Sequence, residues 1–398
     1  MTTSLHMETQ NIARELFDSY DFFHASEIIS CRFTHADMLI WLHSLKEQHL
    51  FTQLPLGTSG EGRTISLYSI GTGPIKVMLW SQMHGDEPTA TMALVDIFNF
   101  LIKNPDHRIT KILQEKLTLL AIPMLNPDGA ERFTRRTAQL IDLNRDALAL
   151  ETSEARILKE ARDMYSPEFG FNLHDQDTRL TVGTTKKITA IALLAPSTDE
   201  SRSDNPVRIK AKKVASVFIQ ILNLFIPGHV AKWDDTFESR AFGDNIQKWG
   251  TSTVLVESGG WKDDPDKFFI RKLNCVALLT SLYAIATGES AQADIGIYEQ
   301  IPFNMKLGCD RIIRNAMLHI SDQTDSLRVD VGINVDARRN SSTGMLERIA
   351  TIVDIGDLST LSALEEEIDV QGAKLDANRI KLDHSFPANE FPLLLKQL

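Results

Sequence analysis

The feature that most constrains this chain is a strand, turn and helix pattern in the first quarter of the sequence. The apolar run Val77–Trp80 is followed by the turn Gln82–Pro88 and then by the helical pattern Thr91–Phe98. Such a turn lies at the carboxyl end of a buried strand, where open α/β sheets bind their ligands. His84 and Glu87 are three residues apart on it, so their side chains can converge on one point. An imidazole and a carboxylate that converge suit zinc, which then needs a third protein ligand.

Two later buried strands end in side chains of the same kind. The segment Phe169–Leu173 ends at His174, and the segment Ser252–Val256 ends at Glu257. Parallel strands present their carboxyl ends at one edge of a sheet, so we expect these side chains to meet the His84 turn. Random placement of polar residues would rarely produce this arrangement.

These residues together predict a catalytic zinc site. His84, Glu87 and His174 would bind one zinc ion per chain and leave the fourth position to water. Glu257 would take a proton from the zinc-activated water and transfer it to the leaving amine. Arg135 would neutralise the developing oxyanion. Each residue alone has a simpler explanation, such as a hydrogen-bonded helix start or a solvated loop charge; the set is informative where its members are not.

The order of the predicted elements indicates an α/β fold. Strands and helices alternate over 64–286, which predicts a mixed, mainly parallel sheet with helices on both faces. Beyond about residue 290, segments such as Leu327–Val335 and Arg348–Ile355 alternate apolar with polar residues and predict a small C-terminal β module. We interpret Leu361–Glu367 as a short helix. The expected domains are an N-terminal helical extension, a catalytic domain and a β-rich C-terminal domain, at residues 1–31, 32–290 and 295–398.

Composition narrows the class of function. The 398 residues carry a formal net charge of −11, which argues against nucleic acid or an anionic membrane as the main partner. The three cysteines, Cys31, Cys275 and Cys309, are widely spaced and show no disulfide framework. The stretch Met1–Arg14 lacks the apolar core of a signal peptide, and no continuous apolar run is long enough to span a membrane. We therefore expect a cytoplasmic protein.

Beyond these arguments, the sequence resembles the zinc carboxypeptidase A-like metallopeptidases over roughly residues 32–290. The matching motifs follow the family order: Thr58–Arg63, His84–Glu87, Asn126–Gly129, Thr134–Arg135, Asp142–Arg145, His174 and Val256–Gly259. The resemblance implies a mixed sheet with zinc at its edge. It assigns the oxyanion role to Arg135, with Arg136 as the alternative register. It also implies that Asn144 and Arg145 hold the carboxylate of the substrate, with Arg145 binding it bidentately.

The sequence departs from the family in one respect. Well-known members carry a tyrosine some twenty residues before the glutamate base, and this chain has no tyrosine between Tyr165 and Tyr283. The corresponding stretch contains Arg240, Phe242 and Asp244, which we regard as candidates for the substrate side-chain pocket.

Three hypotheses about function follow. The first is a zinc metallocarboxypeptidase that hydrolyses a C-terminal peptide or peptide-like amide bond of a substrate with a free carboxylate. The alternative is a zinc amidohydrolase of N-acyl amino acids, similar to aspartoacylase and succinylglutamate desuccinylase. Those enzymes carry a C-terminal β module, which residues 295–398 could resemble. A catalytically silent binding protein is disfavoured because every ligand and Glu257 are present. The substrate side chain, the oligomeric state and the role of the β module are open at this point.

Overall fold

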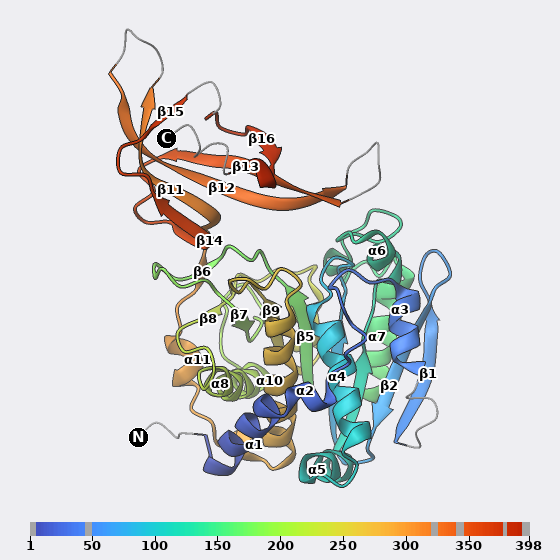
Figure 1. Cartoon of the computed structure of the whole chain (residues 1–398). Helices are drawn as coiled ribbons and strands as arrows, with labels where there is room; N and C mark the ends of the chain where they lie inside the picture. The colour runs from blue at the N-terminus through green and yellow to red at the C-terminus, as the bar shows by residue number, and fades with distance from the viewer. Residues whose placement is uncertain (1–4, 44–49, 320–324, 340–345, 377–379, 392–398) are drawn as a thin grey trace. The chain divides into compact units, whose positions relative to one another are not determined.

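The computed structural model divides the chain into two compact units (Figure 1). The first unit comprises residues 1–177 and 189–304, and the second comprises 178–188 and 305–398. The structure describes residues 5–43, 50–319, 325–339, 346–376 and 380–391. Short stretches of the expected N-terminal extension and C-terminal domain lie outside these ranges. The sequence did not indicate that the segment 178–188 joins the second unit.

The first unit is built on an eight-stranded sheet with the order β1-β2-β4-β3-β5-β9-β7-β8. Its strands are β1 Phe51–Thr58, β2 Thr64–Ile70, β3 Ile75–Ser81, β4 Leu117–Ile122, β5 Phe169–Asp175, β7 Ile191–Leu194, β8 Val230–Lys232 and β9 Ser252–Ser258. The pairs β4–β3, β3–β5, β5–β9 and β7–β8 are parallel, whereas β1–β2, β2–β4 and β9–β7 are antiparallel. The predicted α/β fold with a mixed, mainly parallel sheet is confirmed.

Helices surround this sheet (Figure 1). They are α1 Met7–Asp18, α2 Tyr20–Phe23, α3 His35–Trp41, α4 Thr89–Lys103, α5 Arg108–Lys116, α6 Pro127–Arg132, α7 Ser153–Tyr165, α8 Pro206–Leu222, α9 Phe242–Lys248, α10 Phe268–Ala286 and α11 Gly296–Gln300, with 3₁₀ turns η2 Leu143–Arg145 and η3 Glu289–Gln292. By length and composition α10 could cross a membrane, but 83% of its apolar window is buried inside the protein. It is the central core helix of this unit.

Both faces of the sheet are covered by apolar side chains, as expected for continuous hydrophobic strands. Along β3, Val77 and Leu79 face the larger core, which holds α4, α8 and α10, whereas Met78 and Trp80 face the smaller core against α7 and α9. This alternation follows from the two-residue period of a strand. The strand is therefore fixed on both sides, and the turn that follows it projects from a rigid edge.

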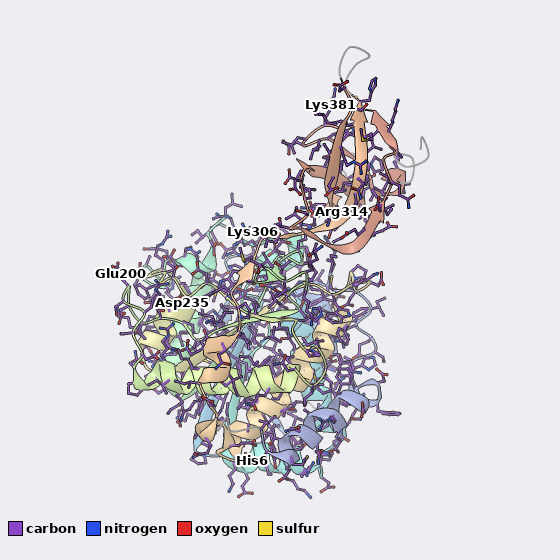
Figure 2. All side chains as sticks on the ribbon, turned by 90° about the vertical axis from the view of Figure 1, so that its left-hand side faces the viewer. His6, Glu200, Asp235, Lys306, Arg314 and Lys381 are labelled. Carbon is purple, nitrogen blue, oxygen red and sulfur yellow. The ribbon has the colours of Figure 1, made fainter. Side chains whose placement is uncertain are left out.

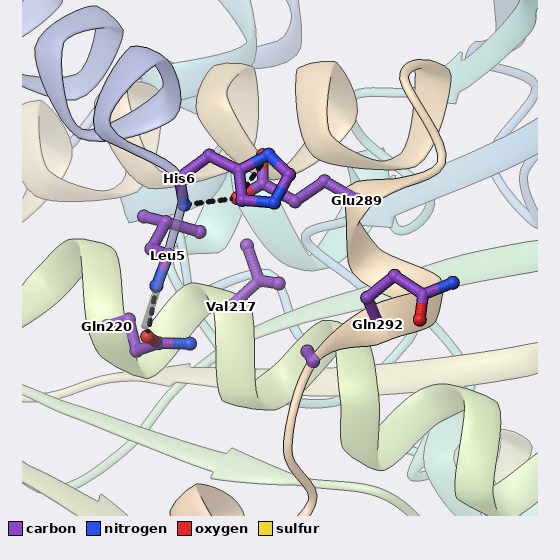
Figure 3. Close-up of a pocket in the computed structure, with 7 residues that line it drawn as sticks. Leu5, His6, Val217, Gln220, Glu289 and Gln292 are labelled. Atoms are coloured by element: carbon purple, nitrogen blue, oxygen red, sulfur yellow. Dashed lines mark hydrogen bonds and ion pairs between the residues drawn. The ribbon is translucent and has the colours of Figure 1, made fainter. Parts of the chain in front are cut away.

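The N-terminal helices are part of the first core. Ile12 and Leu16 of α1 are fully buried in it. Figure 3 shows the start of this segment, where the backbone N–H of Leu5 donates to Gln220 at 2.8 Å and that of His6 donates to Glu289 at 2.6 Å. These bonds tie the N-terminal segment to α8 and η3.

A buried ion pair holds the same segment from inside. The Asp96 carboxylate on α4 accepts from Arg271 on α10 at 2.7 and 2.5 Å. It also accepts from the hydroxyl of Tyr20 and from the backbone N–H of Ala25. Asp96 and Arg271 are almost completely buried. A buried charge needs such full pairing, so these contacts act as a unit.

The second unit is a separate β structure. Its main sheet has the order β14-β11-β12-β13-β16, with β15 paired to β11. The strands of this part of the chain are β6 Thr181–Val182, β10 Asn304–Met305, β11 Gly308–His319, β12 Leu327–Arg339, β13 Leu346–Gly356, β14 Ser362–Asp369, β15 Lys374–Asp376 and β16 Ser385–Pro387.

One sequence prediction for this unit is wrong. The stretch Leu361–Glu367, interpreted as a short helix, lies in β14 from Ser362 onward, and β14 pairs in parallel with β11. Arg314 of β11, labelled in Figure 2, donates to Glu367 of β14 at 2.9 Å and to Asp330 of β12 at 3.0 Å. Tertiary pairing of this kind overrides the weak helical propensity of an acidic segment.

The buried pair yields a stability prediction. Asp96→Ala leaves the Arg271 guanidinium buried and unpaired, so we expect a loss of about 3–5 kcal/mol in the free energy of unfolding. Arg108→Ala removes only half-exposed ion pairs to Glu8 and Glu15, and should cost about 1 kcal/mol or less. All five tryptophans lie in the first unit, so tryptophan fluorescence in a denaturant titration reports this transition. Equal losses in the two variants would contradict the role given to the buried pair.

Candidate active site

The carboxyl ends of β3, β5 and β9 lie side by side at one edge of the sheet. His84 follows β3, while His174 of β5 and Glu257 of β9 are direct partners in the parallel register. A close approach fixes the turn after β3: a Cβ atom at Gly85 would lie 2.0 Å from the carbonyl carbon of Gly129. Only glycine fits there, so the turn packs directly on the Asn126–Gly129 motif. The sequence prediction that these strand ends meet agrees with the geometry.

Two histidines converge on one carboxylate. The Nδ1 atom of His84 lies 2.7 Å from Oε1 of Glu87, and Nδ1 of His174 lies 2.6 Å from Oε2. One ligand atom from each residue falls within 4.8 Å of the others, and all three residues are buried. No other group of this kind is found among the described residues.

The donor set fits zinc. On its other side, the His84 ring lies with Nε2 3.2 Å from the Asp142 carboxylate, which can accept its proton and leave Nδ1 as an acceptor. An acceptor nitrogen and a carboxylate oxygen cannot stay 2.7 Å apart without a proton or a cation between them. Two imidazoles and one carboxylate are the ligands of a catalytic zinc, and the carboxylate on His84 is the usual outer partner.

The electrostatics at this edge depend on compensation. Burial alone would raise the pKa of Glu87, but the His174 and His84 rings outweigh it and hold that pKa well below its usual range. Burial lowers the pKa of His174. At Glu257, burial and the charges of Glu87 and Asp175 raise the pKa of the carboxyl group well above its usual value. An added cation would offset this crowding of acids.

Arg135 lies beside the metal ligands. Its Nη1 is 3.2 Å from Oε1 of Glu87, and its Nε donates to Asp142 at 3.1 Å. Arg136, the alternative register, instead donates to the carbonyl oxygen of Leu140 and does not line the cavity. Of the two registers, Arg135 is therefore the one that lies at the cavity.

A cavity of about 470 Å³ opens over this edge, lined only by residues of the first unit. Its lining includes the three candidate ligands and Glu257, together with Arg135, Asn144, Arg145 and Asp244. Arg145 is partly exposed and lies 3.3 Å from the carboxylate of Glu238. The side-chain oxygen of Asn144 accepts from the backbone N–H of Phe242 at 2.8 Å. Asn144 thus positions the start of α9 as well as lining the cavity.

Two of the predicted pocket residues are placed elsewhere. Phe242 is fully buried in the smaller core beside Trp249, so the prediction that it lines the pocket is wrong. Arg240 is exposed, pairs with Glu238 and does not line the cavity, so that prediction is also wrong. Asp244 does line the cavity and is largely buried. Phe242 and Asp244 both lie in the first turn of α9, which points successive side chains in different directions, whereas Arg240 precedes the helix.

Sequence reasoning missed three charged residues at the site. Asp142 belongs to the Asp142–Arg145 motif, and the motif alone does not indicate that it contacts both His84 and Arg135. Asp175 follows His174 and accepts from Thr89 at 2.6 Å. Lys267 donates to Asp175 and to the carbonyl oxygen of Ser258, each at 3.1 Å. Lys267 belongs to no recognisable motif, and only the fold places it beside the end of β9, the strand of Glu257.

Comparison with known proteins agrees with this geometry. Residues 38–171 match the zinc carboxypeptidase family. The predicted resemblance to the zinc carboxypeptidases is confirmed. The fold is similar to the metallo-carboxypeptidase of Burkholderia cenocepacia, with 16% identity, a TM-score of 0.52 and coverage of 65% of this chain and 70% of that one. It is also similar to the metallo-carboxypeptidase of Pseudomonas aeruginosa in complex with (2-guanidinoethylmercapto)succinic acid. The identity is 18% and the TM-score 0.52, with coverage of 65% of this chain and 70% of that one.

Curated proteins named as carboxypeptidases match this chain only in part. Carboxypeptidase 2 of Trichophyton tonsurans is 28% identical over 162 residues, which is 40% of this chain and 29% of the relative. Cytosolic carboxypeptidase 6 of Mus musculus is 27% identical over 183 residues, which is 41% of this chain and 33% of the relative. The chain thus spans about a third or less of the length of these relatives. The family match covers residues 38–171, and the solved structures share the fold of the first unit.

Proposed function

We propose that this protein is a zinc metallocarboxypeptidase that removes a C-terminal residue bearing a free carboxylate. The observation that carries the proposal is the arrangement of His84, Glu87 and His174 beside Glu257, in a cavity that also presents Arg145. We propose one zinc ion per chain, since the described residues offer one such ligand group. A cytoplasmic location is also part of the proposal; it is supported by three unpaired cysteines, which suit a reducing compartment.

The ligands are held in place by their neighbours. Zinc bound to the two histidines and Glu87 would supply Lewis acidity toward water and toward the substrate carbonyl. Asp142 orients the His84 ring, and Asp175 donates its backbone N–H to Glu87 at 3.2 Å. Such outer contacts preset the geometry before substrate arrives.

The acid–base work falls to Glu257. Its carboxylate would accept a proton from the attacking water and deliver it to the leaving amine. The ammonium of Lys267 bonds to the backbone of Ser258 and to Asp175, so it ties the ends of β9 and β5 together beside the base. Arg135, next to Glu87, would stabilise negative charge on the substrate oxygen.

The substrate carboxylate would bind at Arg145. This side chain lines the cavity, and its partner Glu238 presents a carboxylate to it at 3.3 Å. Hydrogen bonds from Arg240 lower the pKa of Glu238 to about 2, so it stays ionised. The contact with Glu238 is a model for how Arg145 would pair with a substrate carboxylate. When the substrate displaces Glu238 from Arg145, Glu238 would stay paired with Arg240.

The role of Glu257 yields the first kinetic prediction. Glu257→Gln keeps the shape of the side chain but removes its basicity, so we expect normal zinc content with kcat lowered by about 10²–10⁴-fold. Glu168→Gln is a matched control, because Glu168 is half exposed and pairs with Lys210 outside the cavity. Quenched, timed assays of product release on zinc-loaded protein measure kcat for both variants. Near-normal turnover in the zinc-loaded Glu257 variant would assign the base to another group.

The binding of the substrate's C-terminal carboxylate by Arg145 yields the second kinetic prediction. A charge-assisted hydrogen bond contributes about 1.5–3 kcal/mol, so amidation of the C-terminus should reduce kcat/KM by about tenfold to a hundredfold. Arg145→Ala should largely remove the advantage of the free acid, whereas Arg136→Ala, outside the cavity, should keep it.

The same assay distinguishes a peptidase from an amidohydrolase of N-acyl amino acids. The amidohydrolase is the alternative proposal because the second unit is rich in β strands. Unblocked tripeptides should be hydrolysed much faster than N-acetyl or N-succinyl amino acids. A strong preference for the acyl amino acids would overturn the peptidase proposal and leave the zinc site intact.

A further inference from the structure

The sheet itself forms the floor of the cavity, in two rows. The register pairs His174 of β5 with Glu257 of β9, which makes the row at the edge. Two residues earlier on the strands, Asn172 pairs with Leu255, and Leu255 pairs with Leu194 of β7. Residues two apart share a face, so both rows face the cavity, about 6.6 Å apart. The second row lies deeper along the sheet than the catalytic row.

The start of α9 closes this deeper part. A Cβ atom built on Gly243 would lie 3.2 Å from the side-chain nitrogen of Asn172 and 3.6 Å from Pro196. A side chain at this position would press on Asn172, so the helix lies close to the sheet here. The next residue, Asp244, lines the cavity as well. We call the space bounded by Asn172, Leu194, Pro196, Gly243, Asp244 and Leu255 the inner pocket.

The inner pocket presents apolar walls and hydrogen-bond acceptors. Leu194, Leu255 and Pro196 offer contact to an aliphatic stem. The side-chain oxygen of Asn172 is buried and has no hydrogen-bond partner. A buried acceptor without a partner is costly, so a ligand that brings N–H donors would be favoured.

Asp244 adds a negative charge to these acceptors. Its side chain is largely buried, and within the described part of the chain it forms no ion pair; its Oδ1 receives one long hydrogen bond, 3.4 Å, from the backbone N–H of Glu238. The neighbouring acids differ, since Glu238 pairs with Arg145 and Arg240 and Asp175 pairs with Lys267. Burial raises the pKa of Asp244 to about 7, as expected for a carboxyl group that lacks a cation.

We propose that the inner pocket binds the side chain of the residue to be released and selects a cationic one, lysine or arginine. The aliphatic stem would lie on the leucines, and the charged head would reach Asn172 and Asp244. Lysine and arginine combine such a stem with a donor-only head. This inference rests on the proposed function and names its substrate class.

Asp244 also lies in the first turn of α9, where an acid can stabilise a helix. That structural role would not explain the buried, unpartnered oxygen of Asn172 on a different element. The two explanations differ in what Asp244→Asn does. Loss of a helix contact would lower activity on all substrates alike, whereas loss of a specificity group would affect cationic residues alone.

The test compares unblocked tripeptides that differ only in their last residue, lysine or norleucine, which share a stem and differ in the ammonium group. For the zinc-loaded wild-type protein we expect kcat/KM to favour lysine by about tenfold or more. Asp244→Asn should lower kcat/KM for the lysine peptide by about tenfold to a hundredfold and change that for norleucine less than about threefold. Asp234→Asn removes the same charge from elsewhere in the cavity lining and should keep the lysine preference.

Each outcome decides one claim. Release of C-terminal residues without a lysine preference would overturn this inference and leave the proposed function standing. Equal losses on both peptides in the Asp244 variant, or the same loss of preference in the Asp234 variant, would also overturn it. Failure of the zinc-loaded wild-type protein to release any C-terminal residue would instead overturn the proposed function.

Discussion

The convergence of two imidazole rings on the buried carboxylate of Glu87 is the interaction on which the site depends. A hydrogen bond of 2.7 Å joins His84 to Glu87 within the turn after β3, and one of 2.6 Å joins His174 of the adjacent parallel strand β5 to Glu87. Because Val77–Trp80 is packed on both faces of the sheet, the turn that carries His84 has little freedom. The fold thus holds the three candidate metal ligands together, as outer contacts do at preset metal sites.

Burial and charge at this edge oppose each other. Glu87, Asp142, Asp175 and Glu257 are brought within one small region, and burial alone would raise the pKa of each carboxyl group. Arginine, lysine and histidine side chains compensate three of them directly. The carboxyl group of Glu257 lacks such a partner among its described hydrogen bonds and ion pairs, and its pKa is raised well above the usual range. A residue so placed, next to a cation site and in a cavity, is suited to proton transfer.

The sequence predicted the site residues that follow buried strands. It missed the residues whose position depends on where a helix begins or on contacts between distant segments. His84, His174 and Glu257 could be placed because each follows a buried strand, and parallel strands share an edge. Phe242 and Asp244 could not be told apart, since their directions depend on where α9 begins. Lys267 reaches Asp175 from 92 residues away and carries no local signal. No strand was predicted for residues 51–58, which contain Pro55 and Gly57; both residues are tolerated in β1 because it lies at the edge of the sheet.

Diffraction data collected at the zinc absorption edge from zinc-soaked crystals would locate the metal directly. We expect one dominant anomalous peak per chain, about 2.0–2.2 Å from a ring nitrogen of His84, a ring nitrogen of His174 and the carboxylate of Glu87. The hydrogen bonds that join both histidines to Glu87 should then be replaced by metal bonds. Intact hydrogen bonds at Glu87, with zinc bound elsewhere on the chain or not at all, would contradict the account.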